Sequence, residues 1–178
     1  CQPAQFGDTQ RLLQGQMPHL TQRLKRTLDK LQKPAEFSYT SIPISLWWGN
    51  LKARYGKQNI EFISRMETEN ILIPEDLFDN VVENLLQNAI MKRKREPDIN
   101  IEVSLFIRQQ KLELSICDDG SAMSEDIARH LFSQPVPSRD GFGIGLYQVA
   151  KQVQHSGYAL RVSENQAGQV CFELSSTE

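Results

Sequence analysis

The sequence lacks any apolar run that approaches the ~20 residues of a membrane-spanning helix. It has only three cysteines, and because no two of them have CxxC spacing, we expect neither a zinc site nor a disulfide framework. The net charge is −2, from 20 basic and 22 acidic residues, so there is no basic field to attract nucleic acid. These absences favour a soluble protein of the reducing cytoplasm that does not bind nucleic acid.

The length and composition are those of a globular protein. Hydrophobic residues make up 39% and charged residues 24% of the 178 positions, which suits one domain, or a small domain with an appended helix. The chain begins with Cys1 instead of Met, which indicates a fragment or a processed product. A cysteine at a mature N-terminus can also mark a lipid anchor, but a fragment boundary is the simpler interpretation.

Residues 8–33 carry a narrow leucine stripe. Most steps between its apolar residues are 3, 4 or 7, the spacing of one helical face, and Lys33-Pro34 ends the pattern. The members of the stripe are Leu12, Leu13, Met17, Leu20, Leu24, Leu28 and Leu31. Because a long helix with so narrow a stripe needs a partner helix, we expect it to pair; packing on its own domain is the alternative.

The rest of the chain alternates between helix and strand patterns. Strict alternation at 99–107 and 112–116 predicts a hairpin, and a broad apolar face from Pro74 to about Lys94 predicts a long buried helix. Further helices are predicted at 46–55, 124–132 and 146–155, and further strands at 60–63, 71–73, 160–162 and 170–174. This order predicts an α+β fold, a two-layer sandwich of a mixed, mainly antiparallel sheet against helices.

Asn84 and Asn88 are four residues apart, so both lie on one face of the predicted helix. Their neighbours in the other positions are apolar, which leaves two amides on an otherwise buried helix. An amide oxygen is a hard ligand that suits Mg²⁺, an ion that keeps several waters and bridges to phosphates. Local hydrogen bonding by both amides is the simpler alternative.

Asp118 ends a predicted strand and precedes Asp119-Gly120. A carboxylate in that place can accept a hydrogen bond from an exocyclic amine, the group that marks adenine. Gly120 lets the backbone approach a flat base closely. An ordinary strand-end turn is the alternative, because Asp-Gly is a common turn dipeptide.

Three glycines, Gly141, Gly143 and Gly145, lead into a predicted helix. This arrangement lets backbone N–H groups and the positive end of a helix face phosphates. It is not the GxGxxG pattern, and it follows a loop instead of a strand, so a Rossmann fold is excluded. Arg139 is placed to clamp a terminal phosphate and Lys92 to point the same way, although a solvated surface charge is the alternative for either.

Taken in order, these patches resemble the ATP-binding catalytic domain of sensor histidine kinases. The Bergerat-type fold of that family is shared with gyrase-type, Hsp90-type and MutL-type ATPases. Glu83 to Ala89 resembles the family's N box, Cys117 to Met123 its G1 box, Leu131 to Val136 its F box, and Gly141 to Leu146 its G2 box. The resemblance covers about residues 55–176.

The resemblance implies a role for each matched residue. It implies that Asn88 ligates Mg²⁺, that Asn84 lines the phosphate site, and that both serve catalysis together with Arg139. The residues implied to contact ATP are Asn84, Asn88, Lys92, Asp118, Gly120, Met123, Phe132, Gly141, Gly143, Ile144, Gly145 and Leu146. Asp118 would bind the adenine amine, and the segment from Phe132 to Gly141 would be a mobile ATP lid.

The chain departs from the family pattern in three places. Ala122 replaces the second glycine of the G1 box. Met91 stands where a phosphate-facing lysine is frequent, so Lys92 is only a neighbour of that position. His19 is followed by Leu20 instead of an acidic residue, so the motif of a phosphoacceptor histidine is missing. We expect all three histidines, including His130 and His155, to be structural or exposed.

The resemblance also implies the domain organisation and the partners. Residues 1–35 would be the second helix of a dimerisation hairpin, and residues 36–178 the catalytic domain of a protein-histidine kinase. This domain would transfer the γ-phosphate of Mg-ATP to a histidine outside the chain. The implied partners are ATP, Mg²⁺, a response regulator receiver domain and a second copy, in the cytoplasmic part of a membrane-bound sensor.

Two alternatives stay open. The first is a related serine kinase or hydrolysing ATPase; it is disfavoured because Glu83, the nearest candidate base, is rotated by about 100° from Asn84 on the helix. The second is a degenerate, non-catalytic module that binds nucleotide or dimerises, which Ala122, Met91 and the missing acceptor would support.

Overall fold

The computed structural model describes residues 40–68, 70–136 and 144–177. The predicted helix at residues 1–35 lies outside these ranges, as do Arg139, Gly141, Gly143 and much of the predicted lid. The strands are β1 (Ser41–Pro43), β2 (Glu61–Met66), β3 (Leu72–Pro74), β4 (Ile101–Arg108), β5 (Lys111–Asp118), β6 (Tyr158–Gln166) and β7 (Gln169–Ser176). The helices are α2 (Ile44–Tyr55), α3 (Glu75–Arg93), α4 (Glu125–His130) and α5 (Gly145–Val153). Within the described ranges, no helix is long and apolar enough to cross a membrane.

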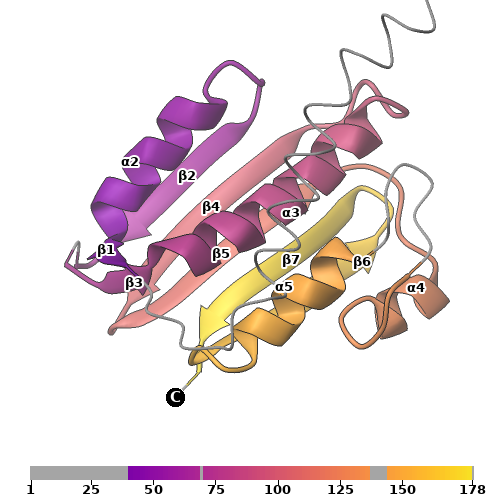
Figure 1. The fold of residues 1–178 in the computed structure, drawn as a ribbon. Coiled ribbons are helices and arrows are strands. Elements are labelled where there is room, and N and C mark those ends of the chain that lie inside the picture. The colour runs from indigo at the N-terminus through magenta and orange to yellow at the C-terminus, as the bar shows by residue number, and fades with distance from the viewer. Residues whose placement is uncertain (1–39, 69, 137–143, 178) are drawn as a thin grey trace, which may run out of the picture. The chain divides into compact units, whose positions relative to one another are not determined.

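The strands form one large and one small sheet. The large sheet has five strands in the order β2-β4-β5-β7-β6 (Figure 1). β2 and β4 pair in parallel, whereas the other neighbours in this sheet pair antiparallel. β1 and β3 form a separate two-stranded antiparallel sheet. The predicted α+β sandwich with a mixed, mainly antiparallel sheet is therefore confirmed.

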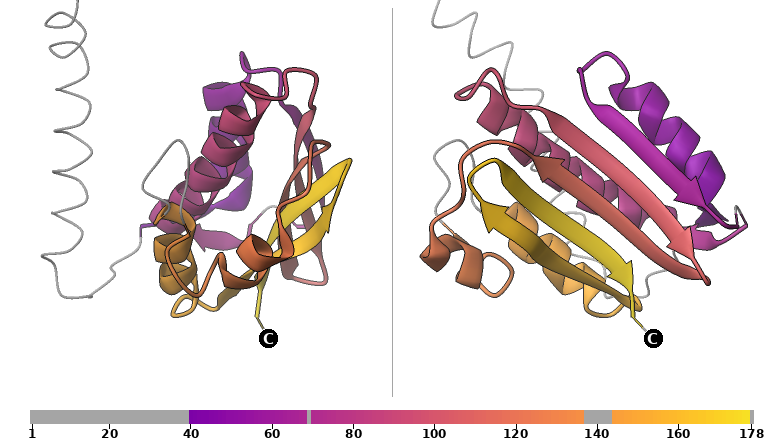
Figure 2. Two further views of the ribbon diagram at one scale, coloured as in Figure 1. Left: turned by 90° about the vertical axis from the view of Figure 1, so that its right-hand side faces the viewer. Right: turned by 180° about the vertical axis from the view of Figure 1, so that it is seen from behind.

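The core lies between one face of the large sheet and helices α2, α3 and α5, which cover that face (Figure 2). Alternate residues of the central hairpin point into it, as their spacing predicted. The buried residues of the hairpin are Ile101, Val103, Leu105, Ile107, Leu112, Leu114 and Ile116. The buried residues of α3 are Leu77, Phe78, Val81, Val82, Leu85, Leu86 and Ala89. The core thus forms where the apolar face of the hairpin, which repeats every two residues, packs against the apolar face of α3, which repeats with the helical period.

α2 is held against α3 by polar contacts and against β2 by an aromatic contact. The indole Nε1 of Trp47 donates to Asp79 Oδ1 at 2.8 Å, and Arg54 pairs with the other carboxylate oxygen at 3.0 Å. Trp48 packs edge-on against Phe62 of β2, with ring centroids 5.7 Å apart. Both tryptophans are buried, so they contribute to the core.

Cys117 and Cys171 form a disulfide between β5 and β7, so the expectation that the cysteines form none is wrong. The two residues are 54 positions apart, but the antiparallel register places them directly opposite each other. Their neighbours Ile116 and Phe172 face the core, so the disulfide lies on the face of the sheet that points away from the helices. Spacing motifs detect only cysteines that are close in sequence. They do not reveal this pair, which strand pairing brings together.

Candidate nucleotide-binding site

Asn84 lies at the junction of α3 and α5. Its Nδ2 donates to the backbone oxygen of Asn80 at 2.7 Å, which fixes the orientation of the amide. A Cβ atom on Gly145 would overlap Asn84 Oδ1, so the amide oxygen occupies the space that a side chain would fill. The absence of a side chain at Gly145 therefore lets the first turn of α5 approach α3 closely.

The N-terminus of α5 is thereby aimed at the amide-bearing side of α3. Ile144, the residue before the helix, makes no side-chain capping hydrogen bond. The first backbone N–H groups of a helix have no partner within it, and the helix dipole adds positive potential there. Leu146 and Val149 are buried, and they hold this helix end against the core. This helix end is therefore a candidate site for an anion such as a phosphate.

We predict that Gly145→Ala weakens the binding of a non-hydrolysable ATP analogue about fivefold. The added methyl group must displace the Asn84 amide and break its bond to Asn80, and losing one such bond costs ~1 kcal/mol. Isothermal titration calorimetry measures the affinity. Gly49→Ala in α2 is the matched control, because a Cβ there meets nothing within 4 Å, and its affinity should be unchanged. Equal affinities of the two variants would contradict the role of Gly145.

Asn88 is exposed one turn further along α3, so its amide oxygen is accessible to a solvated cation. Among the described residues, no group of three or more His, Cys, Asp or Glu side chains is arranged to hold a metal ion. A single amide suits Mg²⁺, which takes few protein ligands when phosphates and waters complete its shell. The residues present therefore fit a metal that arrives with a nucleotide better than a resident one.

The other end of the site is built around Asp118, at the end of β5. This carboxylate is only 7% exposed, and its Oδ1 accepts a hydrogen bond from the backbone N–H of Gly120 at 3.1 Å. Nζ of Lys92 donates to the same oxygen at 2.5 Å and to the carbonyl oxygen of Ser121 at 2.6 Å. The sequence predicted that Lys92 lies beside the phosphates and that Asp118 binds the adenine. In the structure, Lys92 binds Asp118 instead, and its contact with the phosphates stays a prediction.

Gly120 is enclosed by side chains from the end of α3. A Cβ atom there would lie 2.7 Å from Glu96 Oε2 and 2.7 Å from Lys92 Cε, so the position has no room for a side chain. Glu96 also accepts hydrogen bonds from Ser121 Oγ at 2.6 Å and Ser121 N at 2.8 Å. These two bonds lower the pKa of the Glu96 carboxyl. Glu96 therefore positions the segment that follows Asp118, a role that the sequence motifs did not reveal.

Two asparagines hold the rest of this segment. Asn165 of β6 accepts from Met123 N at 2.9 Å and donates to Met123 O at 3.0 Å, which clamps that backbone on both sides. Asn100 binds Asp119 through its side chain at 2.7 Å and its backbone N–H at 2.6 Å, and these bonds lower the pKa of Asp119. Neither asparagine belongs to a local motif, so only the tertiary structure reveals their function.

The region predicted as the F box packs on the core where it is described. Ser124 caps α4 by accepting a hydrogen bond from Ile127 N. The ring of Phe132 lies edge-on to Phe172, with centroids 6.4 Å apart, and Met123 packs against the same core. The predicted contacts of Met123 and Phe132 with ATP stay predictions. Of the histidines, His130 is half-buried and His155 is exposed, whereas His19 lies outside the described residues.

The described site residues thus form two connected groups. One group joins the amides of α3 to the N-terminus of α5, and the other joins Lys92 and Glu96 to the end of β5. A helix N-terminus suited to an anion at one end and a buried carboxylate beside the enclosed Gly120 at the other are features expected of nucleotide-binding domains with a helix-on-sheet fold. Residues 74–177 match the family described as histidine kinase-, DNA gyrase B-, and HSP90-like ATPase, and the chain belongs to this family.

Curated relatives in this family are sensor proteins. Sensor protein RprX of Bacteroides fragilis is 30% identical over 122 residues, which are 63% of this chain and 24% of that protein. Sensor histidine kinase DcuS of Escherichia coli K12 is 33% identical over 80 residues, 44% of this chain and 15% of that protein. The chain therefore spans about a quarter or less of the length of these relatives.

Solved structures with the same fold include histidine kinases. The catalytic domain of histidine kinase ThkA has a TM-score of 0.64 at 20% identity, covering 79% of this chain and 96% of that one. ThkA in complex with response regulator protein TrrA has a TM-score of 0.63 at 14% identity, covering 99% of this chain and 52% of that one. The described part of the chain is thus an ATP-binding domain of the histidine kinase type.

Proposed function

We propose that this domain transfers the γ-phosphate of Mg-ATP to a histidine on a helix outside the chain. The observation that carries the proposal is the close approach of Gly145 to Asn84, because it puts a helix N-terminus without a side-chain cap beside the amide of Asn84. A triphosphate needs such donors together with a metal ligand. Family membership and the sensor kinases among the relatives support the same conclusion.

The chemistry expected of the chain is positional and electrostatic. Asn88 would hold Mg²⁺, and Asn84 would orient the phosphates against the first turn of α5. Mg²⁺, when bound with ATP, would neutralise charge on the phosphates. Asp118 would accept a hydrogen bond from the base amine at the opposite end. Arg139 and Gly141 of the proposed lid would exclude water and contact the phosphates, which Gly143 would also approach.

The proposed partners follow from the relatives. The solved complex of ThkA with a response regulator supports a receiver domain as the partner that takes the phosphate onward. A second copy would pair through residues 1–35, and the domain would lie in the cytoplasmic part of a membrane-bound sensor. The sensor proteins among the relatives support this placement.

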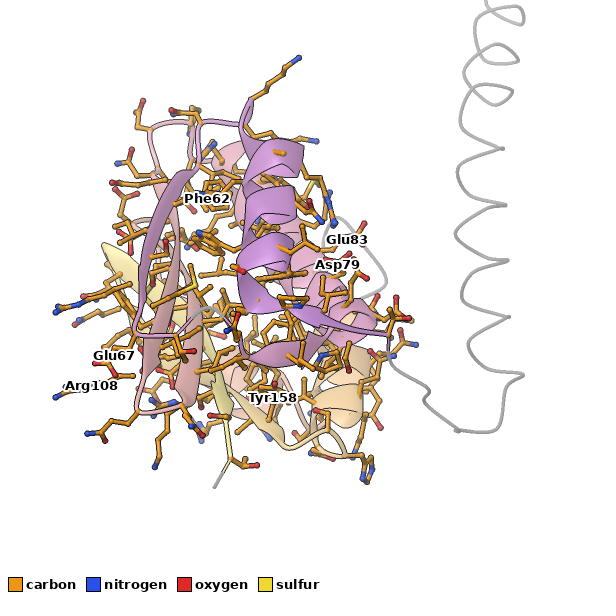
Figure 3. The ribbon with its side chains drawn as sticks, turned by 90° about the vertical axis from the view of Figure 1, so that its left-hand side faces the viewer. Phe62, Glu67, Asp79, Glu83, Arg108 and Tyr158 are labelled. Atoms are coloured by element: carbon orange, nitrogen blue, oxygen red, sulfur yellow. A yellow bond between two sulfur atoms is a disulfide. The ribbon has the colours of Figure 1, made fainter. Side chains whose placement is uncertain are left out.

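Two other functions compete with this proposal. Hydrolysis requires a general base near the metal amide, but Glu83 lies beside Asp79, the residue that contacts α2 (Figure 3). Burial and the charge of Glu83 raise the pKa of Tyr55 in α2, which agrees with that orientation. The ion pair between Lys92 and Asp118 favours a non-catalytic module, because Lys92 already binds the carboxylate that would otherwise bind the adenine amine.

Calorimetry with a non-hydrolysable ATP analogue tests the proposal directly. We expect binding that strengthens when Mg²⁺ is added and weakens when EDTA removes it. A dissociation constant near 1 mM corresponds to ~4 kcal/mol of binding free energy, so affinities in that range are measurable. Absence of binding at ~1 mM nucleotide would favour the non-catalytic module. Steady ATP hydrolysis by the isolated chain, lost in an Asn84 variant, would favour the hydrolysing ATPase.

A further inference from the structure

The base end of the site contains a cation that nothing in the resemblance assigns there. We propose that Lys92 sets the base selectivity of this nucleotide site, by competing with a base amine for Asp118 and by donating to a base carbonyl. This inference rests on the proposed function. It concerns purine nucleoside triphosphates. It predicts that the site binds a 6-amino purine and a 6-oxo purine with similar affinity.

The ion pair covers the carboxylate. The side chain of Lys92 is 14% exposed and that of Asp118 only 6%, so neither group is available to a ligand without rearrangement. Nζ of Lys92 bonds to Asp118 Oδ1, the oxygen that also accepts from Gly120 N. A base amine that reaches this carboxylate must therefore take the place of the ammonium.

The ammonium has a second partner close to its present position. Glu96 lies four residues further along the chain, and the positive charge of Lys92, after the two Ser121 hydrogen bonds, helps to lower the pKa of its carboxyl group. The position of a Cβ on Gly120 is 2.7 Å from both Glu96 Oε2 and Lys92 Cε, so these two side chains are neighbours. The ammonium of Lys92 can thus move away from Asp118 and still have the Glu96 carboxylate as an anionic partner.

The same ammonium offers a hydrogen-bond donor to a different base. A lysine has three N–H donors, and two of them are used by Asp118 and the carbonyl of Ser121. The third can donate to the carbonyl oxygen of a 6-oxo purine, a group that a bare carboxylate would repel. Lys92 therefore weakens the binding of an amino purine and strengthens that of a 6-oxo purine.

The test compares ATP with ITP, which differ at the 6-position of the base and share the triphosphate. Calorimetry of the whole chain with Mg²⁺ gives both dissociation constants for the wild type and for Lys92→Met. Any contact of Lys92 with the phosphates cancels in their ratio. We expect Lys92→Met to bind ATP more tightly and ITP less tightly, which raises the preference for ATP at least about tenfold.

Two further variants act as controls. Lys94→Met removes the same charge from the exposed end of the same helix and should leave the wild-type ratio unchanged. Lys92→Arg keeps a cation with several donors and should keep the wild-type ratio within about threefold. Thermal unfolding of each variant verifies that it is folded, and Lys92→Arg provides the comparison if Lys92→Met is unstable.

The outcomes separate the inference from the proposed function. An equal change in both affinities, or no change in Lys92→Met, would overturn the selectivity role while the site remained a nucleotide site. A wild type that binds neither nucleotide would overturn the proposed function itself, and the inference with it. A raised preference for ATP in Lys92→Met, with none in Lys94→Met, would establish Lys92 as the selectivity residue.

Discussion

Asn88→Ala is expected to abolish Mg-ATP-dependent phosphorylation of a supplied acceptor hairpin, with a loss of rate of more than about 100-fold. Metal stabilisation of transferring phosphates is worth several kcal/mol, and each 1.36 kcal/mol corresponds to about tenfold in rate. Asn88 is exposed on α3, so its removal leaves the core intact and should not unfold the domain. The measurement is single-turnover transfer of labelled phosphate to a dimerisation hairpin from a related kinase.

Gln87→Ala is the matched control for this experiment. Gln87 is also an exposed amide on α3, but it is rotated by about 100° from Asn88 on the helix, away from the proposed metal. It should retain transfer within about threefold, because it contacts neither metal nor phosphate. Normal transfer by Asn88→Ala would show that the assignment of the metal ligand is wrong.

Opening the Cys117–Cys171 disulfide is expected to lower the free energy of unfolding by up to about 4 kcal/mol. The bond closes a loop of 54 residues, and the loss of chain entropy in the unfolded state grows with loop length. Denaturant titrations with and without a reducing agent measure the difference. For a domain of this size, a loss of this magnitude is a large fraction of the total stability.

Variants separate the disulfide from other effects of the reducing agent. The double variant Cys117→Ser, Cys171→Ser should have the stability of the reduced protein and should no longer respond to the agent. Cys1→Ser keeps both members of the pair and should respond like the wild type. If reduction leaves the unfolding midpoint unchanged, the disulfide does not stabilise the domain.

The sheet–helix architecture could be predicted where a local pattern repeats. The alternation from Ile99 to Ile107 indicated a strand because only one of its faces is buried. The turn at Gln109 and Gln110 agrees, since both residues have a positive φ, the conformation that a two-residue hairpin turn requires. The helix with Asn84 was equally clear, because its apolar residues repeat with a helical period.

Contacts between distant segments could not be predicted in the same way. No local pattern indicates that β2 pairs in parallel with β4, because that choice depends on how the intervening helix α3 packs. The Cys117–Cys171 disulfide depends on the register of β5 against β7. Both features follow from tertiary packing, which a periodicity analysis does not contain.

The site was predictable in its residue types but not in its internal pairing. Asn84 and Asp118 were recognised because their types and spacing suit a nucleotide. The bond between Lys92 and Asp118 joins residues 26 positions apart, and the sequence suggested a phosphate role for Lys92 instead. The clamps made by Glu96 and Asn165 were missed because an isolated polar residue carries no local signal of its partner.

One helix carries groups for both ends of the proposed nucleotide. Asn84, Asn88 and Lys92 follow one another at intervals of four on α3, and a rise of 1.5 Å per residue puts the first and last about 12 Å apart along the axis. The helix therefore fixes the distance between the two ends of the site, because that distance depends only on the number of residues between them. Substituting the residues between these positions leaves this distance unchanged. Inserting or deleting one residue would rotate Asn84 and Lys92 by about 100° relative to each other around the helix axis.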